Sequence, residues 1–498
     1  MPEAAPRAPA RSRKLLRHGL YAVAALTLLV AAVATYLAAT FDPNDYRQRV
    51  IDLVRDKTGR TLEIRGDIGL SFWPDVAVRL EALSLTERES SARFASVERA
   101  RVRLEIAPLL KREIVASELL IDGARVALTR DADGRLNIDD LLARGGETPR
   151  FDIARLAVTR SAITFRDLAS GRQYDVTNLH LETGRLTAAA ESPLALAFEL
   201  RDAAGALAVH AKLIGRLGID LAQKRYAILG AALELAGRAG SMTDAKLRAR
   251  GDVTADLASA KVTLAPFELA LEGIRNETEH VSVNAAAAEV VHVAGEAIGR
   301  EVHASLAAQG RAGTTDVKIV LPAVARRADA IAAEAASVAI RLVRGEHVLE
   351  AHATAPLEAN IAARELALKD LRAELTLSGP HISRGGIRGA VKGDLRLDSD
   401  PEGVQLRLAG RVDESNVKAQ LAAAGFAAPV YTFAVDIDRL DLDRYLRGDK
   451  APVRERTGAT PAESLLAPLS DLPASGTLTV GVLSGAGAKA NNVKVVLK

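Results

Sequence analysis

The sequence predicts a mainly β protein with a few helices, in which one N-terminal transmembrane helix is followed by a long antiparallel sheet. Three observations carry this prediction: an uncharged apolar run near the N-terminus, a dominant period of two from Leu62 onward, and turn signals between the strand-like runs. Apolar residues make up 48% of the chain and aromatics 3%. The expected elements are therefore thin and bury Ala, Leu, Val and Ile.

The N-terminal apolar run spans Gly19 to Ala39 without a charged residue. At 1.5 Å per residue a helix of this length is roughly 31 Å long, about the thickness of a bilayer's hydrocarbon core. Basic residues crowd residues 1–18, which predicts a cytoplasmic N-terminus and places the bulk of the chain across the membrane. A cleaved signal peptide is the alternative, suggested by the small residues at 37–40, but the run is longer than the usual apolar region of such a peptide.

A short amphipathic helix is expected directly after the membrane segment, between Asp42 and Arg60. Val50, Ile51, Leu53 and Val54 have near-helical spacing there, and Gly59 follows the last turn. Beyond this helix the alternation predicts half-buried strands, as in residues 76–80, 101–106, 194–200, 404–408 and 431–437.

Glycine-containing turns separate these runs, among them Asp131 to Gly134, which favours antiparallel meanders. The Ala-rich stretch from Ala323 to Ala339 fits a helix as well as a strand. Residues 447–470 have the composition of a linker. The expected organisation is therefore a basic tail (1–18), a transmembrane helix (19–39), an N-terminal region (40–190), a β-rich region (191–446), the linker, and a final β segment (471–498).

Several classes of function lack their usual residues. The formal charge of +3 is small and no basic run with interleaved aromatics follows the N-terminus, so nucleic-acid binding is not expected. Cysteine is absent, and the nine histidines have no zinc-site spacing. Phosphate-binding loops and G-x-S-x-G elbows are missing as well. We expect no cofactor, no metal and no enzymatic activity.

Two acidic clusters have alternative explanations. Asp131 and Asp133 begin like a calcium loop, but the later ligands are missing, and a hairpin turn explains them better. Asp436 and Asp438 share one strand face and could form a pair of glycosidase carboxylates, but a solvent-facing acidic edge is the simpler interpretation.

The candidate functional residues are the apolar positions of the alternating strands. They fit two structures from the pattern alone: the closed core of a sandwich, or the lining of an open apolar groove that holds lipid tails. The candidates for groove lining are Ile163, Phe165, Leu194, Leu196, Phe198, Leu200, Val404, Leu406, Leu408, Phe433 and Val435.

Three blocks of the sequence resemble the AsmA family of bacterial envelope proteins. The block after the anchor carries Asp42, Pro43, Tyr46, Thr58, Gly59, Arg60, Gly66, Pro74 and Leu83 of the family pattern. A second block spans residues 119–142 and departs at Ile138, where a Trp is common. The third, from Arg411 to Leu446, carries Ser415, Tyr431, Asp438, Leu440, Asp443 and Tyr445.

The resemblance implies an inner-membrane anchor, a body in the periplasm and a role in outer-membrane assembly or in lipid passage between the two membranes. It also implies a chorein-like N-terminal region and a gutter-shaped sheet, which favours the groove. The expected partners are then the inner membrane, a phospholipid or other envelope lipid, and possible envelope assembly proteins. The alternative is a scaffold or assembly factor that affects outer-membrane protein insertion without carrying lipid. Family members usually continue with further strands, so the chain is expected to be short at its C-terminus.

Overall fold

The computed structural model describes residues 44, 47–71, 76–105, 116–142, 152–187, 190–311, 313–380, 386–399, 402–425, 430–446, 473–485 and 487–497. The predicted transmembrane helix (19–39) and the predicted linker (447–470) lie outside these residues. Within them, no helix combines the length and the apolar character that crossing a membrane requires. The chain divides into two compact units, residues 1–203 and 204–498, which are described separately.

The first unit is a mixed sheet with short helices. Its elements are α2 (Arg47–Thr58), β1 (Leu62–Ile64), β2 (Ile68–Ser71), β3 (Val76–Thr86), β4 (Arg93–Leu104), β5 (Ala116–Arg130), α4 (Asp139–Leu142), β6 (Asp152–Ile153), β7 (Arg155–Asp167), β8 (Arg172–Thr183), β9 (Leu186–Thr187) and β10 (Ser192–Asp202). Both β1 and β2 pair with β3, and the sheet continues through β4, β5, β7, β8 and β10. Strands β6 and β9 form a separate two-stranded ribbon.

The helix predicted after the membrane segment is present as α2. Gly59 ends it in the left-handed conformation, with φ of 67°. The Gly59 amide donates to the Arg55 carbonyl oxygen at 2.8 Å, and the Thr58 hydroxyl donates to the Val54 carbonyl oxygen at 2.6 Å. The first bond satisfies a carbonyl that the last helical turn leaves free, and the second adds a side-chain donor at the end of the helix.

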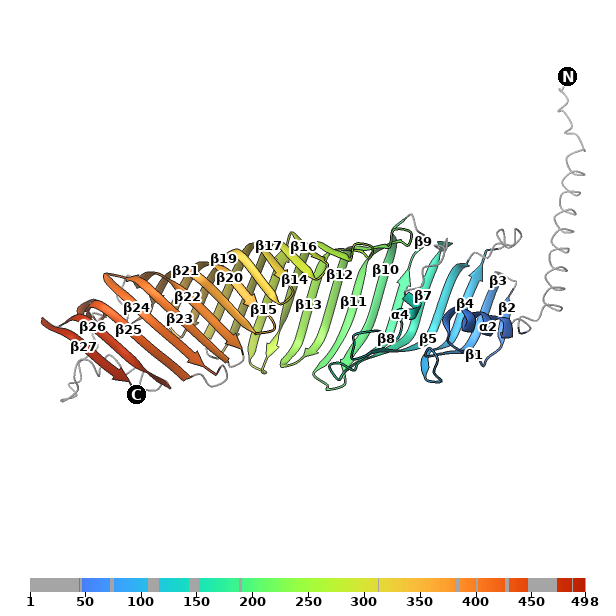
Figure 1. Ribbon diagram of the computed structural model, residues 1–498, viewed down its shortest axis with the longest axis horizontal. Helices are drawn as coiled ribbons and strands as arrows, with labels where there is room; N and C mark the ends of the chain where they lie inside the picture. The colour runs from blue at the N-terminus through green and yellow to red at the C-terminus, as the bar shows by residue number, and fades with distance from the viewer. Residues whose placement is uncertain are drawn as a thin grey trace, which may run out of the picture. The chain divides into compact units, whose positions relative to one another are not determined.

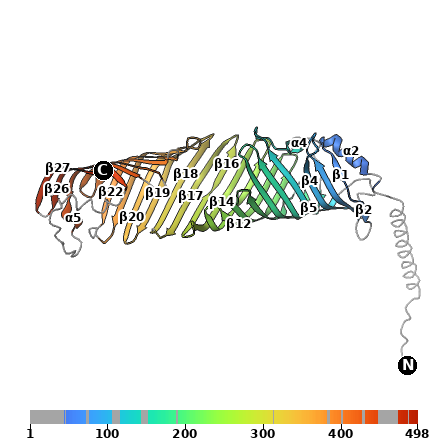
Figure 2. The ribbon, with the colours of Figure 1, turned by 90° about the horizontal axis from the view of Figure 1, so that it is seen from below.

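The second unit is a long sheet whose strands follow one another in chain order. They are β11 (Leu207–Asp220), β12 (Arg225–Ala239), β13 (Met242–Asp256), β14 (Lys261–Arg275), β15 (Glu279–Ala287), β16 (Glu289–Val293), β17 (Glu296–Gly310), β18 (Gly313–Arg327), β19 (Ala330–Arg344), β20 (His347–Asn360), β21 (Glu365–Ser378), β22 (Ile387–Ser399), β23 (Glu402–Val412), β24 (Ser415–Ala424), β25 (Val430–Asp441), β26 (Ala474–Gly485) and β27 (Ala488–Leu497), with the short helix α5 (Leu442–Leu446) after β25. Figures 1 and 2 show these strands side by side.

The mainly β prediction is confirmed, with two corrections. The sheets are mixed, because β5 pairs with β7, and β25 with β26, in parallel. Each parallel pair is joined by a connection longer than a hairpin, which lets the chain return before the next strand starts. The helix alternative for Ala323 to Ala339 is wrong: these residues belong to β18, the turn after it and β19, where hydrogen bonds to neighbouring strands outweigh the helix propensity of Ala.

One row of residues on one face of the second unit's sheet is apolar, and it crosses every strand of the unit but β16. Directly opposed residues on neighbouring strands point to the same side of a sheet, so the pairing register traces a row across the unit. This long apolar row consists of Leu213, Leu233, Ala249, Leu269, Ala285, Ala304, Ile319, Val338, Ala353, Ala373, Val391, Gly410, Val417, Ile437, Val480 and Val493. It contains no polar side chain. We call the side that carries it the apolar face and the other side the polar face.

The middle of the strands from β11 to β22 carries a line of irregularities. Register shifts occur in the pairs β11–β12, β12–β13, β13–β14, β19–β20, β20–β21 and β21–β22. Gly230, Glu301 and Asp370 have positive φ within their strands. Aligned bulges bend a sheet along one line. Beside this line a buried cluster of Ala355, Leu368 and Leu371 lies on the apolar face.

Candidate functional site

The predicted lining residues of the second unit all lie on the apolar face. Leu406 is opposite Leu421, and Leu421 is opposite Phe433, so these three belong to one row. That row also includes Ala333, Leu357, Leu368 and Leu395 from the preceding strands. Leu408 and Val435 flank Ala419 in the adjacent row, and Val404 lies in the next row on the other side. The register therefore brings all five predicted residues together.

The predicted residues of the first unit form a patch of their own. Leu196 lies at the end of a row of opposed residues that also contains Ile68, Leu80, Ala100, Ile121, Val158 and Leu181. Leu200 joins Ile163 through Val176, and the rings of Phe165 and Tyr174 stack at 6.5 Å. Leu194 is buried, whereas Leu196, Phe198 and Leu200 are half-buried. Phe198 lies at a register irregularity between Ala197 and Glu199.

The apolar face of the second unit keeps part of its surface exposed. Leu421 is 38% exposed and Leu306 is 37% exposed, although both lie on interior strands. Inward-facing residues of a closed sandwich core are covered by the opposite sheet. The described elements in closest contact within each unit are neighbouring strands, with small contacts of α2 to β1, β5 to β6 and α5 to β26. The row around Leu421 thus differs from a fully covered core.

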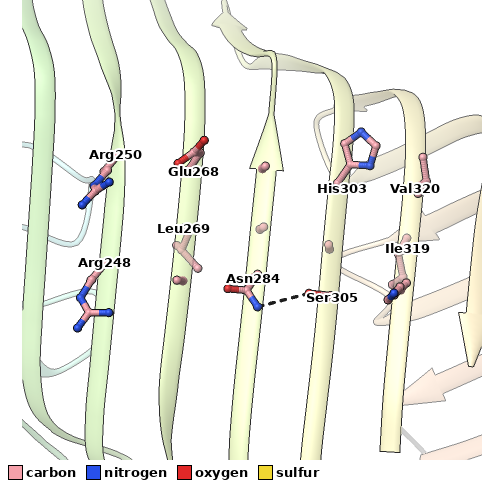
Figure 3. Close-up of a pocket in the computed structure, with 14 residues that line it drawn as sticks. Arg248, Arg250, Glu268, Leu269, Asn284, His303, Ser305, Ile319 and Val320 are labelled. Carbon is pink, nitrogen blue, oxygen red and sulfur yellow. Dashed lines mark hydrogen bonds between the residues drawn. The ribbon is translucent and has the colours of Figure 1, made fainter. Parts of the chain in front are cut away.

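A hollow of about 660 Å³ lies on the polar face, across β13 to β18. Arg248 and Arg250 stand on one side, as Figure 3 shows. Lys318 lines the hollow from β18. Between them the floor is made of small side chains, and the Asn284 amide donates to the Ser305 hydroxyl at 3.5 Å. The hollow exists because long basic side chains flank short ones. Glu268 is the one carboxylate among its lining residues, so the hollow contains no pair of acids for catalysis.

Arg60 organises the first unit in a way that the sequence pattern did not indicate. Its side chain is buried and forms a two-pronged ion pair with Asp140, with 2.7 Å from Nη2 to Oδ1 and 3.2 Å from Nε to Oδ2. Nη2 also donates to the Asn137 carbonyl oxygen at 2.5 Å, and the guanidinium lies 4.5 Å from the centre of the Phe94 ring. Arg60 thereby joins the end of α2 to α4 and β4. The sequence marked Arg60 only as part of the Thr58-Gly59-Arg60 motif. It did not indicate the partners of Arg60, because they are distant in the sequence.

Two carboxyl groups of the first unit have strongly favoured charged forms. The Arg60 guanidinium holds the pKa of Asp140 below its usual range. Hydrogen bonds from Arg160 and Arg99 hold the pKa of Asp122 well below its usual range. Asp122 lies beside Gly123, which has a positive φ of 70°. Both carboxyl groups are therefore ionised near neutral pH.

The two acidic clusters noted in the sequence, at Asp131 and at Asp436 and Asp438, lie in a turn and on a strand. The Asp131 carbonyl oxygen accepts from the Gly134 amide at 3.1 Å, and its side chain accepts from the Arg135 amide at 2.8 Å, which closes a turn. Asp438 accepts two hydrogen bonds from Asn416 at 2.7 Å, and Asp436 is exposed. Among the residues that the structure describes, no group of three or more acidic or histidine side chains is placed to hold a metal ion.

Similarity to known proteins identifies the family of this chain. Residues 12–287, more than half of the chain, match the AsmA family. The chain belongs to the AsmA family. It is similar to Protein AsmA of Escherichia coli (strain K12), with 25% identity over 166 residues, covering 32% of this chain and 27% of that protein. The chain thus matches about a quarter of that AsmA protein's length. No solved structure matches it.

The structure explains several of the residues in the AsmA-family blocks. Gly59 adopts the positive φ that ends α2, and Arg60 makes the buried ion pair. A side chain at Gly66 would meet the Glu81 Cβ at 2.7 Å, so that position requires the close approach of two strands. Ser415, from the last block, is buried at the start of β24. These AsmA positions therefore have packing roles.

Proposed function

We propose that this protein is anchored in the bacterial inner membrane by residues 19–39, with its N-terminus in the cytoplasm and its bulk in the periplasm, and that it supports outer-membrane homeostasis by carrying phospholipid acyl chains between the two membranes. In this proposal it binds and guides lipid without converting it. The observation that carries the proposal is the long apolar row from Leu213 to Val493, which crosses the second unit without a polar side chain. Membership of the AsmA family supports the envelope location.

The length of the row suits a path for lipid tails. At about 4.8 Å between strands, the row is on the order of 70 Å long, several times the length of an extended 16-carbon chain. An acyl chain of that size exposed to water costs on the order of 12 kcal/mol, at about 0.8 kcal/mol per methylene. A continuous apolar face lowers the cost of exposing the acyl chain at every position along the row. A polar row across the path would raise that cost again where the chain crosses it.

The curvature argues for a trough on the apolar face. Beside the line of bulges the buried residues are Ala355, Leu368 and Leu371, on the apolar face. Lys369 and Glu358, on the polar face at the same place, are exposed and form an ion pair at 2.6 Å. Side chains crowd on the concave side of a bend and spread on the convex side. The sheet in this proposal therefore bends toward its apolar face and forms a groove.

Photocrosslinking separates the lipid path from the scaffold alternative. A photoreactive amino acid replaces Phe433, on the apolar face of the second unit, or Phe198, in β10 of the first unit. Ala434, on the polar face of β25, serves as the matched control. After irradiation in cells, we expect lipid adducts at the two phenylalanine positions and none at Ala434. Protein adducts without lipid at Phe433 would favour the scaffold or assembly factor. Equal lipid capture at Ala434 and Phe433 would contradict a lipid path on the apolar face.

A further inference from the structure

One outer row of the apolar face contains two basic side chains and no other charged residue. The row consists of Tyr226, Ala255, Val262, His292, Ala297, Arg326, Ile331, Ala359, Leu366, Leu397, Val404, Ala423 and Tyr431. His292 and Arg326 are its basic members, and every other member is aliphatic or a tyrosine. We call these two residues the basic pair.

The basic pair lies near the margin of the face. His292 is opposite Ala297 and Ala297 is opposite Arg326, so two strand spacings, about 10 Å, separate their backbones. Each is one residue pair inward from a hairpin turn, since Val293 and Arg327 precede the turns. The small side chain of Ala297 leaves the space between them open. Both basic side chains are exposed and long enough to converge on one group above Ala297.

The placement of Arg326 on the apolar face is supported by packing at Gly299. A Cβ atom at Gly299 would meet the Val302 Cγ2 at 2.9 Å and the Val324 Cγ1 at 3.1 Å, so these side chains share one side of the sheet. This side is the apolar face, because Val302 stands two residues before Ala304 of the long apolar row. Arg326 follows Val324 by two residues and therefore shares that side. His292 follows Val290, which is opposite Gly299, by the same interval.

The nearby carboxylates are engaged elsewhere. Glu296 pairs with Arg327 at 3.6 Å, and Glu289 pairs with Arg300 at 3.7 Å. Arg326 donates through Nε to the Ala328 carbonyl oxygen at 3.0 Å. In the described part of the chain neither His292 nor Arg326 forms an ion pair, so the Nη donors of Arg326 remain available to an anion.

We infer that the basic pair binds the phosphate of a phospholipid headgroup while the acyl chains of that lipid lie on the apolar face. The inference rests on the proposed function and assigns the headgroup of the carried phospholipid to two residues of this chain. A guanidinium offers paired donors to phosphate oxygens, and a histidine adds a third donor or acceptor. In a phospholipid the phosphate is joined to the acyl chains through glycerol, so a phosphate site at the margin of an apolar face matches the layout of the molecule.

A binding comparison with two lipids tests the inference. Full-length protein in detergent is titrated with phosphatidylglycerol and with diacylglycerol of the same acyl chains, using a fluorescent acyl label. The test variant carries Arg326→Gln and His292→Gln, and the matched control carries Arg327→Gln, which lies on the polar face. We expect the test variant to bind phosphatidylglycerol about tenfold more weakly and diacylglycerol unchanged. The control should bind both lipids as the unaltered protein does.

The possible outcomes distinguish the inference from the function on which it rests. Equal loss for both lipids, or no loss for either, would overturn the phosphate site while leaving lipid carriage standing. Failure of the unaltered protein to bind either lipid would overturn both. Glycerol phosphate, added as a competitor, separates a headgroup site from a site for free phosphates. If it displaces phosphatidylglycerol at equal concentration, the site recognises the soluble phosphate and the lipid assignment is wrong.

Discussion

Arg60 and Asp140, 80 residues apart in the sequence, form a two-pronged ion pair with 2.7 Å between Nη2 and Oδ1. Arg60 has 1% of its surface exposed and the Asp140 side chain 12%. Such a pair contributes little net stability when intact, but losing one partner leaves a buried charge without compensation. The pair therefore determines where α4 and the end of α2 sit on the first unit's sheet.

Replacing Arg60 should destabilise the first unit strongly. We expect Arg60→Leu to cost about 3–5 kcal/mol, because Asp140 and Glu87 lose their buried cation. Arg65→Leu is the control, since Arg65 is largely exposed and its pair with the exposed Glu63 should contribute little to stability. Amide hydrogen exchange in β4 and β5 measures both. Equal protection in the two variants would show that the Arg60 network does not hold the unit together.

The same pair predicts how acid affects the first unit. Because Arg60 lowers the pKa of Asp140, the folded state holds this carboxyl's proton less tightly than the unfolded state does. The stabilisation is complete above the ordinary aspartate pKa of about 3.9 and is lost as the pH falls through the lowered pKa. In Asp140→Asn the dependence of unfolding free energy on pH below about 4 should become shallower. An unchanged slope in Asp140→Asn would show that the pair with Arg60 does not contribute to this pH dependence.

A charge on the apolar face should block lipid more than it unfolds the protein. Leu406→Arg places a guanidinium in a row that is half-buried, so the new side chain can extend to water at a cost of about 1–2 kcal/mol in unfolding free energy. We expect lipid capture by a photoreactive residue at Phe433 to fall about tenfold, because tails avoid a charged row. Gln405→Arg adds the same charge on the polar face and should leave capture unchanged. Leu196→Arg should act likewise in the first unit, with Ala195→Arg as its control. Collapse of the fold in Leu406→Arg would identify Leu406 as an ordinary core residue.

The line of bulges predicts a sensitive glycine in β13. Gly251 has φ of 156°, and a side chain there would stand 2.2 Å from the Pro266 carbonyl oxygen on the neighbouring strand. Gly251→Ala should therefore cost about 3 kcal/mol or more, since conformational strain and overlap with backbone combine. Gly205→Ala adds a Cβ at a positive φ but in open space, so about 1 kcal/mol is expected. Chemical denaturation compares the two, and equal losses would mean that the strands separate easily at Gly251.

The alternation of apolar and polar residues predicted the strands and the face that each residue takes, because a strand's side chains alternate regardless of its neighbours. Leu406 and Phe433 were chosen in this way, and both lie on the apolar face. The pattern did not predict whether the Ala-rich stretch is helix or strand, since Ala fits both. Pairing with the neighbouring strands makes it β-structure. The sequence pattern did not predict the basic pair either. His292 and Arg326 are far apart in the chain, and the pairing register alone brings both beside Ala297.

By itself, the sequence determined the mainly β class, the helix after residue 42 and the identity of the apolar positions, since each depends on patterns within a few residues. The tertiary structure decided the register that joins those positions into one row, the parallel pairs β5–β7 and β25–β26, and the contact of Arg60 with Asp140. The physical reason is that hydrogen bonds between strands and buried ion pairs join residues distant in the chain, and no local periodicity encodes which distant partner they take.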